Sequence, residues 1–176
     1  MASLTRALMG LMLRGLMHEN QALIERFYQS FQKRDADGMC ACYHPDIEFS
    51  DPAFPGLRGG EAKAMWRMLV ERGKDLTLEF SGVEADSSSG KAHWEAHYTF
   101  SATGRRVHNI IDAKFEFKDG KIIRHTDHFD FWRWTRMAIG PAGILLGWTP
   151  FMQNKIRKTA RKGLADYIAK KPDATR

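Results

Sequence analysis

A histidine, a carboxylate and an aromatic residue follow a tight turn in the last predicted strand. The dipeptide Asp119-Gly120 is typical of a two-residue hairpin turn, and apolar and polar residues alternate after it as they do in a strand. This alternation places His125, Asp127 and Phe129 on one face. A carboxylate in such company can transfer protons inside an apolar pocket, because burial disfavours the charged form of a carboxyl.

A second carboxylate, Asp51, stands before Pro52 at the end of an earlier predicted strand. If Asp51 and Asp127 face one cavity, their titrations move apart and one proton is shared. One acid could then take a proton from a carbon beside a carbonyl, while the other donates a hydrogen bond to the enolate oxygen. The plainer alternatives are an Asx turn at Asp51 and an ion pair of Asp127 with Arg124 or Lys121 at a sheet edge.

Three histidines could assist these acids. His125 shares a strand face with Asp127 and is the better partner by pattern. His97 alternates with the apolar set that includes Trp94, so it faces outward if that set faces the cavity. His108 lies in the following strand. A single histidine in a strand is more often a surface residue or a hydrogen-bonded residue than a catalyst.

The composition is that of one folded domain. The chain has 176 residues, 43% of them hydrophobic and 27% charged, which suffices for a sizeable core. Cys40 and Cys42 form a Cys-x-Cys pair with no second pair, and the seven histidines show no His-Glu-x-x-His spacing. We therefore expect packing cysteines in a reducing compartment, with no metal site and no cofactor.

Basic residues gather toward the C-terminus. Residues 131–176 hold ten Lys/Arg and two Asp/Glu, a net charge of +8 against +6 for the whole chain. This segment could meet phosphates, anionic lipid or an acidic partner, but we favour a solvated helix face. Trp132, Trp134, Trp148 and the apolar run 144–146 could dock on an anionic membrane or fold back as a lid or dimer contact. No nucleic-acid-binding signature is present, so we expect no nucleic-acid partner.

The N-terminal segment does not match a membrane-spanning helix or a secretory signal. No apolar run reaches the roughly 18 residues of a membrane-spanning helix. Residues 1–17 are apolar and acid-poor, but Arg14 interrupts them and no small-residue cleavage site follows. An organelle address is one interpretation of this segment. We expect instead a short helix that covers the domain, and a cytoplasmic protein.

Three helices and a short strand come first in the predicted order of elements. Apolar spacing predicts a helix over residues 19–33 and another over 61–72, ended by Gly73. Between them, Asp35 or Asp37 can cap a short helix over 39–43. A short strand over 47–51 follows it.

Four further strands follow, and then a helix. Alternating residues predict strands over 76–86, 91–102, 106–117 and 121–131, joined by short turns, so the sheet should be antiparallel. Glycines at 140, 143 and 147 then break the chain, and Thr149-Pro150 is typical of a helix start. Helices followed by a curved sheet indicate an α+β fold with a cavity between the two layers.

This order of elements resembles the NTF2-like superfamily over roughly residues 19–132. The segment from Asp35-x-Asp-Gly38 to Asp51-Pro52 is similar to the second helix and first strand of ketosteroid isomerases, whose general base matches Asp51. The segment from Gly120 to Asp130 is similar to the last hairpin of limonene-epoxide hydrolases and SnoaL-like cyclases, whose acid/base group matches Asp127. Thr103-Gly104-Arg105 and Phe115-x-Phe117 fit the middle hairpin and the penultimate strand.

Departures from these families narrow the implied activity. The oxyanion tyrosine of ketosteroid isomerases falls at Phe27, with Tyr28 beside it, and their second donor falls at Asp112 or Ala113. The Arg–Asp pair of limonene-epoxide hydrolases falls near Ala96 and Tyr98. These departures count against steroid isomerisation and epoxide hydrolysis, and the resemblance that remains is to SnoaL-like proteins.

The resemblance implies an NTF2-like cone, in which three N-terminal helices pack on a strongly curved antiparallel sheet that encloses a pocket. We divide the chain into an N-terminal helical extension (1–18), an NTF2-like domain (19–132) and a basic C-terminal helical extension (133–176). Asp127, Asp51 and His125 are the catalytic candidates. The expected pocket-lining residues are Phe27, Tyr28, Tyr43, Phe49, Trp66, Tyr98, Asp112 and Phe129.

The expected function is that of an acid/base isomerase or cyclase for a hydrophobic carbonyl compound such as a polyketide, a terpenoid or a lipid-derived ketone. The alternatives are a non-catalytic module for ligand binding or dimerisation and a protein that associates with membrane surfaces through its tail. The expected partners are a small hydrophobic molecule and a second copy of the chain, bound through the exposed sheet face.

Overall fold

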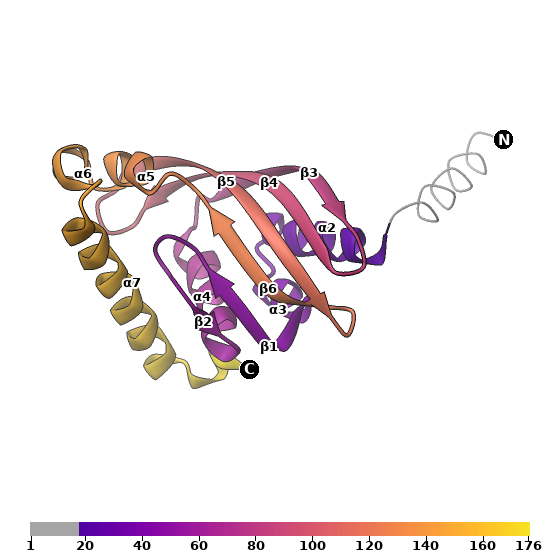
Figure 1. Ribbon diagram of the computed structural model, residues 1–176. Coiled ribbons are helices and arrows are strands. Elements are labelled where there is room, and N and C mark those ends of the chain that lie inside the picture. The colour runs from indigo at the N-terminus through magenta and orange to yellow at the C-terminus, as the bar shows by residue number, and fades with distance from the viewer. Residues whose placement is uncertain (1–17) are drawn as a thin grey trace.

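A computed structural model describes residues 18–176, and the predicted N-terminal helix over 1–17 lies outside the described residues. One six-stranded sheet curves around three helices (Figure 1). The helices are α2 (Glu19–Gln32), α3 (Ala36–Ala41) and α4 (Gly60–Arg72). The strands are β1 (Tyr43–Ser50), β2 (Leu57–Arg58), β3 (Thr77–Ala85), β4 (Ser89–Phe100), β5 (Arg105–Lys118) and β6 (Lys121–His128).

The strand order is β2-β1-β6-β5-β4-β3. Neighbouring strands are antiparallel as predicted, except that β1 and β6 pair in parallel. This pairing joins the first long strand to the last, which are far apart in the sequence, so no tight turn dictates their direction. β1 also begins earlier than predicted, because Tyr43 belongs to this strand and not to the preceding helix.

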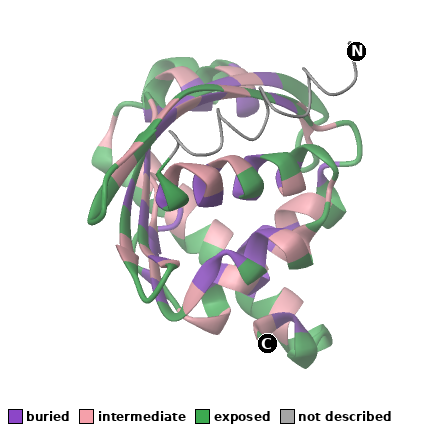
Figure 2. Ribbon diagram, turned by 90° about the vertical axis from the view of Figure 1, so that its right-hand side faces the viewer, coloured by how far each residue is buried: buried purple, intermediate pink, exposed green. Residues whose placement is uncertain are grey.

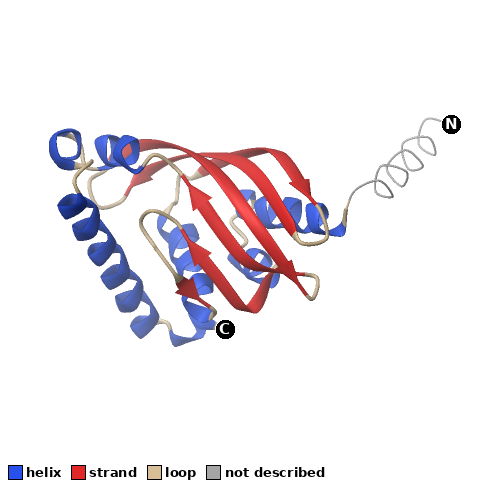
Figure 3. Cartoon of the chain, in the orientation of Figure 1, coloured by secondary structure: helices blue, strands red, loops and turns tan. Residues whose placement is uncertain are grey.

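The spacing of apolar residues along α2 explains why this segment is a helix with one buried face. The apolar residues at helical spacing are all buried, namely Leu23, Ile24, Phe27, Tyr28 and Phe31. The side chain of His18 caps the first turn by accepting a hydrogen bond from the backbone N–H of Asn20. Asp35 caps α3 in the same way through Gly38. Figure 3 shows all three helices on the concave side of the sheet, and Figure 2 shows the buried residues gathered between these layers.

The C-terminal extension forms three more helices and a final 3-10 turn. These are α5 (Phe131–Ala138), α6 (Pro141–Leu146), α7 (Pro150–Lys170) and η1 (Pro172–Thr175). Thr149 caps α7 as expected. Helices α5 and α6 were not predicted from the sequence pattern. Asp130 ends the predicted last strand early, because its side chain accepts a hydrogen bond from the backbone N–H of Arg133 and so starts α5.

The extension packs on the domain through a second apolar cluster. Phe131 and Trp134 of α5 are buried with Val107 of β5, and Ile156 of α7 joins them. Farther along, Leu164 of α7 enters the main core. The extension therefore spans from β5 to α4. No helix in the described part of the chain is both long enough and apolar enough to cross a membrane.

Candidate functional site

The site lies on the concave face of β6, a strand with neighbours on both sides. In β6, His125 is opposite Phe49 of β1 and Phe115 of β5, and Asp127 is opposite Ala113 of β5. His125 is fully buried, and Asp127 is 3% exposed. Because Ala113 is small, the next strand can send a large side chain across β5 toward Asp127.

One chain of hydrogen bonds crosses the core from α4 to β4. The indole N–H of Trp66 donates to Tyr43 Oη at 2.8 Å, and this oxygen lies 2.7 Å from His125 Nδ1. His125 Nε2 lies 3.0 Å from Asp127 Oδ1, to which the indole N–H of Trp94 also donates at 3.3 Å. Every link of the chain is buried.

The two indole donors determine the direction of this chain. Because Tyr43 Oη accepts from Trp66, its own O–H can donate to His125 Nδ1. A neutral His125 then carries its proton on Nε2 and donates to Asp127 Oδ1, so every donor has an acceptor. Oδ1 of Asp127 thus receives two N–H groups, whereas no residue among 18–176 hydrogen-bonds Oδ2. Oδ2 is the atom that remains for a proton or a ligand.

Asp51 lies directly after β1 and forms the Asx turn that was the alternative interpretation for it. Its Oδ1 accepts the backbone N–H groups of Ala53 and Phe54. Burial raises the pKa of Asp51 to about 7, and the negative charge of Asp127 adds to the rise, while the two N–H groups oppose it. The turn and the raised pKa coexist because the effect of burial is larger than the opposing effect of the two N–H groups.

Asp127 does not form the ion pair that was the alternative for it. Arg124 pairs with Glu116 instead, and Lys121 Nζ donates to the backbone oxygen of Ala41. Asp127 is therefore a core residue whose hydrogen-bond partners are His125 and Trp94.

The charge of these carboxylates adds to the rise in pKa that burial causes in three tyrosines, Tyr28, Tyr43 and Tyr98. Burial raises the pKa of Tyr28 well above 10, with the charge of Asp127 as the next cause. Burial also raises the pKa of Tyr98 to about 12, and the charge of Asp51 adds to this rise. Tyr28 Oη is buried with no hydrogen-bond partner among the described residues, whereas Tyr98 Oη accepts the indole N–H of Trp134 at 2.8 Å.

Aromatic rings enclose the histidine. Their centroids lie 4.4–5.9 Å from that of His125, and they belong to Phe27, Phe49, Trp66 and Phe115. Five of the expected pocket-lining residues are buried in this inner cluster, namely Phe27, Tyr28, Tyr43, Phe49 and Trp66. Their side chains pack against one another, so this part of the concave face is filled.

The other three expected lining residues lie elsewhere. Tyr98 and Phe129 are partly buried and, with Ala53, contact both the main core and the cluster of the C-terminal extension. We call these three residues the seam. Asp112 does not join the site, because it is exposed and pairs with His93 at 2.8 Å on the outer face of the sheet.

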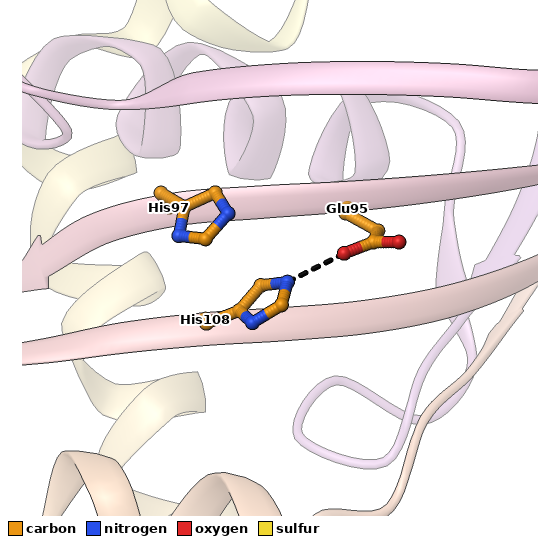
Figure 4. Close-up of side chains that lie close together, drawn as sticks. All are labelled: Glu95, His97 and His108. Carbon is orange, nitrogen blue, oxygen red and sulfur yellow. Dashed lines mark hydrogen bonds and ion pairs between the residues drawn. The ribbon is translucent and has the colours of Figure 1, made fainter.

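A second group of titratable side chains lies on that outer face. Glu95 and His97 of β4 and His108 of β5 place one ligand atom each within 4.8 Å of one another (Figure 4). Glu95 and His108 are hydrogen-bonded, and the two imidazole rings stack at 4.0 Å with only 13° between their planes. Nearly parallel rings do not direct their nitrogen lone pairs at one point, so a bound transition-metal ion would require one ring to turn.

The roles of the two indole donors, Trp66 and Trp94, were not predicted from the sequence. Alternation puts Trp94 on the inner face, but strand pattern alone does not show that its N–H reaches across β5 to Asp127. Trp66 was expected only to line a pocket. A tryptophan on the same face as a buried acid two strands away, with a small residue between them, is the signal that could have been used.

Comparisons with known proteins point to one family and one fold. Residues 24–125, more than half of the chain, match the SnoaL-like domain. No curated protein matched the sequence. Among solved structures, an NTF2-like protein of unknown function from Burkholderia pseudomallei is 18% identical, with a TM-score of 0.60 over 69% of this chain and 98% of that one.

Two further structures share the fold. An LEH-like epoxide hydrolase from Mycobacterium tuberculosis is 22% identical, with a TM-score of 0.56 over 76% of this chain and 94% of that one. TerC, crystallised with polyporic acid, is 21% identical, with a TM-score of 0.54 over 64% of this chain and 92% of that one. At these identities the likeness establishes the fold alone, and the predicted NTF2-like architecture is confirmed.

Proposed function

Because the chain belongs to the SnoaL-like domain family, we propose that it is an acid/base enzyme, an isomerase or cyclase, for a hydrophobic carbonyl compound. The observation that carries this proposal is the chain of hydrogen bonds that holds Asp127 Oδ1 on His125 and Trp94 and leaves Oδ2 without a partner among the described residues. A base must be positioned and must keep one atom for the proton that it takes. Asp127 meets both requirements inside an aromatic core.

The proposed step moves one proton off a carbon and back. Asp127 Oδ2 takes a proton from the carbon beside the substrate carbonyl, and the C–H electron pair shifts to form an enolate. The protonated form of Asp51, available because its pKa is about 7, donates a hydrogen bond to the enolate oxygen. Asp127 then returns its proton to carbon, on the original atom or on a conjugated one.

The seam supports entry at the Asp51 end of the site. Asp127 is 3% exposed, so a substrate can reach it only when packed side chains move apart. Ala53, Tyr98 and Phe129 are only partly buried and lie between two apolar clusters, whereas the inner cluster is tightly enclosed. The crystallisation of TerC with polyporic acid is in line with a hydrophobic organic ligand for this site.

Hydrogen–deuterium exchange at carbon tests the proposal without requiring the natural substrate. Lipophilic ketones such as 2-tetralone are incubated with the full chain in D₂O, and deuterium uptake beside the carbonyl is followed by mass spectrometry. The proposal predicts deuterium uptake faster than in buffer alone, at a rate that saturates as the ketone concentration increases. A ketone that binds, as shown by calorimetry, but exchanges only at the buffer rate would instead indicate a ligand-binding module.

A further inference from the structure

Large apolar side chains are exposed at one corner of the molecule, where α5, α6 and the start of α7 meet (Figure 1). Six of the seven large hydrophobic residues that are exposed in the described part belong to this corner. They are Trp132, Ile144, Leu145, Leu146, Trp148 and Phe151. Leu145 is 71% exposed and Phe151 is 73% exposed. A gathering of this size marks an interaction surface.

Close packing between α5 and α6 keeps these apolar side chains exposed to solvent. Gly143 and Gly147 of the α6 corner approach Thr135 of α5 so closely that a Cβ atom on either glycine would lie 2.0 Å from an oxygen of Thr135. The indole N–H of Trp132 donates to the backbone oxygen of Ile144 at 3.4 Å, which ties α5 to α6. Of the tryptophans expected either to dock or to fold back, Trp134 is buried, and Trp132 and Trp148 face solvent.

An open hollow of about 720 Å³ adjoins this surface, and Ile144 contributes to both. The other residues that line it are Gly104, Arg105, Arg106, Arg133, Arg136 and Met137. Four arginines therefore contribute to the lining of one concave place at the edge of an apolar patch.

None of these four arginines forms an ion pair within residues 18–176, where the ion pairs of arginine involve other members of the chain. Asp75 is the acid that Arg106 influences, since hydrogen bonds with Thr99 lower the pKa of that carboxyl and the charge of Arg106 is a minor further cause. Arg105 and Arg133 are held by backbone oxygens, those of Met137 at 2.9 Å and His108 at 2.6 Å. The guanidinium of Arg136 lies over the ring of Trp132 at 4.5 Å. Guanidinium groups that are positioned but unpaired suit phosphate oxygens, which accept their forked N–H donors.

We propose that this corner docks the protein on an anionic phospholipid surface. The side chains of α6 enter the boundary between headgroups and acyl chains, while the arginine hollow receives lipid phosphates. Apolar side chains rimmed by cations are the composition of segments that lie in a membrane interface. Lys155 and Lys158, exposed on α7, extend the positive surface. Charge complementarity thus favours an anionic bilayer over an apolar protein partner.

Flotation with vesicles tests the proposal. The full chain is mixed with phosphatidylcholine vesicles, or with vesicles that contain 30 mol% phosphatidylglycerol, at 0.1 M NaCl. We expect binding to the anionic vesicles only. Leu145→Ser and the double variant Arg106→Gln/Arg136→Gln should each reduce the partition coefficient by about tenfold. Neither Arg106 nor Arg136 makes a hydrogen bond that holds the described fold together, and circular dichroism checks folding.

A matched control removes the same charge elsewhere. Lys114→Gln/Lys118→Gln lies toward the far end of β5 and should float like the wild type. The proposal is wrong if the wild type ignores both vesicles, binds neutral vesicles equally, or loses as much binding through the control as through the arginine variant. It is also wrong if Leu145→Ser only converts a dimer to a monomer in size-exclusion chromatography. Asp127→Asn should float normally, since docking does not rest on proton transfer.

Discussion

Asp51 and Asp127 share one arrangement at the level of single atoms. Each uses Oδ1 as an acceptor of two N–H groups, from the backbone in Asp51 and from His125 and Trp94 in Asp127. The second oxygen of each acid makes no hydrogen bond within residues 18–176. Orientation and proton transfer are thereby assigned to different atoms of the same carboxyl group, which is why an acid that is fixed in place can still exchange a proton.

The raised pKa of Asp51 predicts a pH-dependent stability. Because the folded state holds this proton more tightly than the unfolded chain, stability falls as the pH rises from about 4 through 7. Asp51→Asn keeps the Oδ1 acceptor and cannot ionise. The free energy of unfolding of the variant relative to the wild type should therefore rise by about 1–2 kcal/mol between pH 5 and pH 8. Urea titrations at both pH values measure it, and a constant difference would contradict a raised pKa.

The hydroxyl of Tyr28, which has no hydrogen-bond partner within residues 18–176, predicts a gain in stability when it is removed. A buried hydroxyl without a partner costs about 1–3 kcal/mol, so Tyr28→Phe should raise the free energy of unfolding by about 1 kcal/mol. If Tyr28 donates to the substrate oxygen in the open site, the same change should slow ketone exchange. Loss of stability in urea denaturation would show instead that Tyr28 Oη is hydrogen-bonded in solution.

At the scale of elements, the spacing of apolar residues, the turn residues and the helix-capping residues explain what the sequence could predict. The stripe of α2, the Asp119-Gly120 turn and the Thr149 cap each act within a few residues, and each led to the right element. The parallel β1–β6 pair and the Trp94–Asp127 bond connect distant segments, and local pattern carries no information about them. The start of α5 was predicted wrongly for a different reason. The alternation of apolar and polar residues continues through Phe129 to Phe131, whereas the Asp130 side chain ends the strand.

The α5–α6 corner predicts opposite outcomes for two glycine substitutions. Gly143→Ala brings a Cβ to 2.0 Å from the backbone oxygen of Thr135, so α5 and α6 must separate, at a cost of about 1–3 kcal/mol. Gly163→Ala in α7 meets only Arg72 Nη1 at 3.6 Å and should stabilise its helix by about 0.5–1 kcal/mol. Thermal denaturation compares the two, and equal effects would contradict close packing at the corner.

At the scale of the molecule, the domain and its C-terminal extension carry different features. The domain carries the two acids, and the extension carries the net positive charge and the exposed apolar corner. The 51–56 loop connects them, because Arg157 donates to the backbone oxygen of Pro52 at 2.9 Å and Arg161 to that of Pro55. Movement of the extension would thus shift the loop that begins at Asp51. Pairing of two copies through the outer sheet face stays a prediction.

The rate of ketone exchange by Asp127→Asn tests the central claim most directly. Asparagine keeps the Oδ1 acceptor for His125 and Trp94, so the fold should persist, but it removes the basic Oδ2. Exchange should fall by about 100-fold or more, while Asp112→Asn on the outer face leaves it unchanged. Wild-type exchange by a folded Asp127→Asn variant would contradict the account.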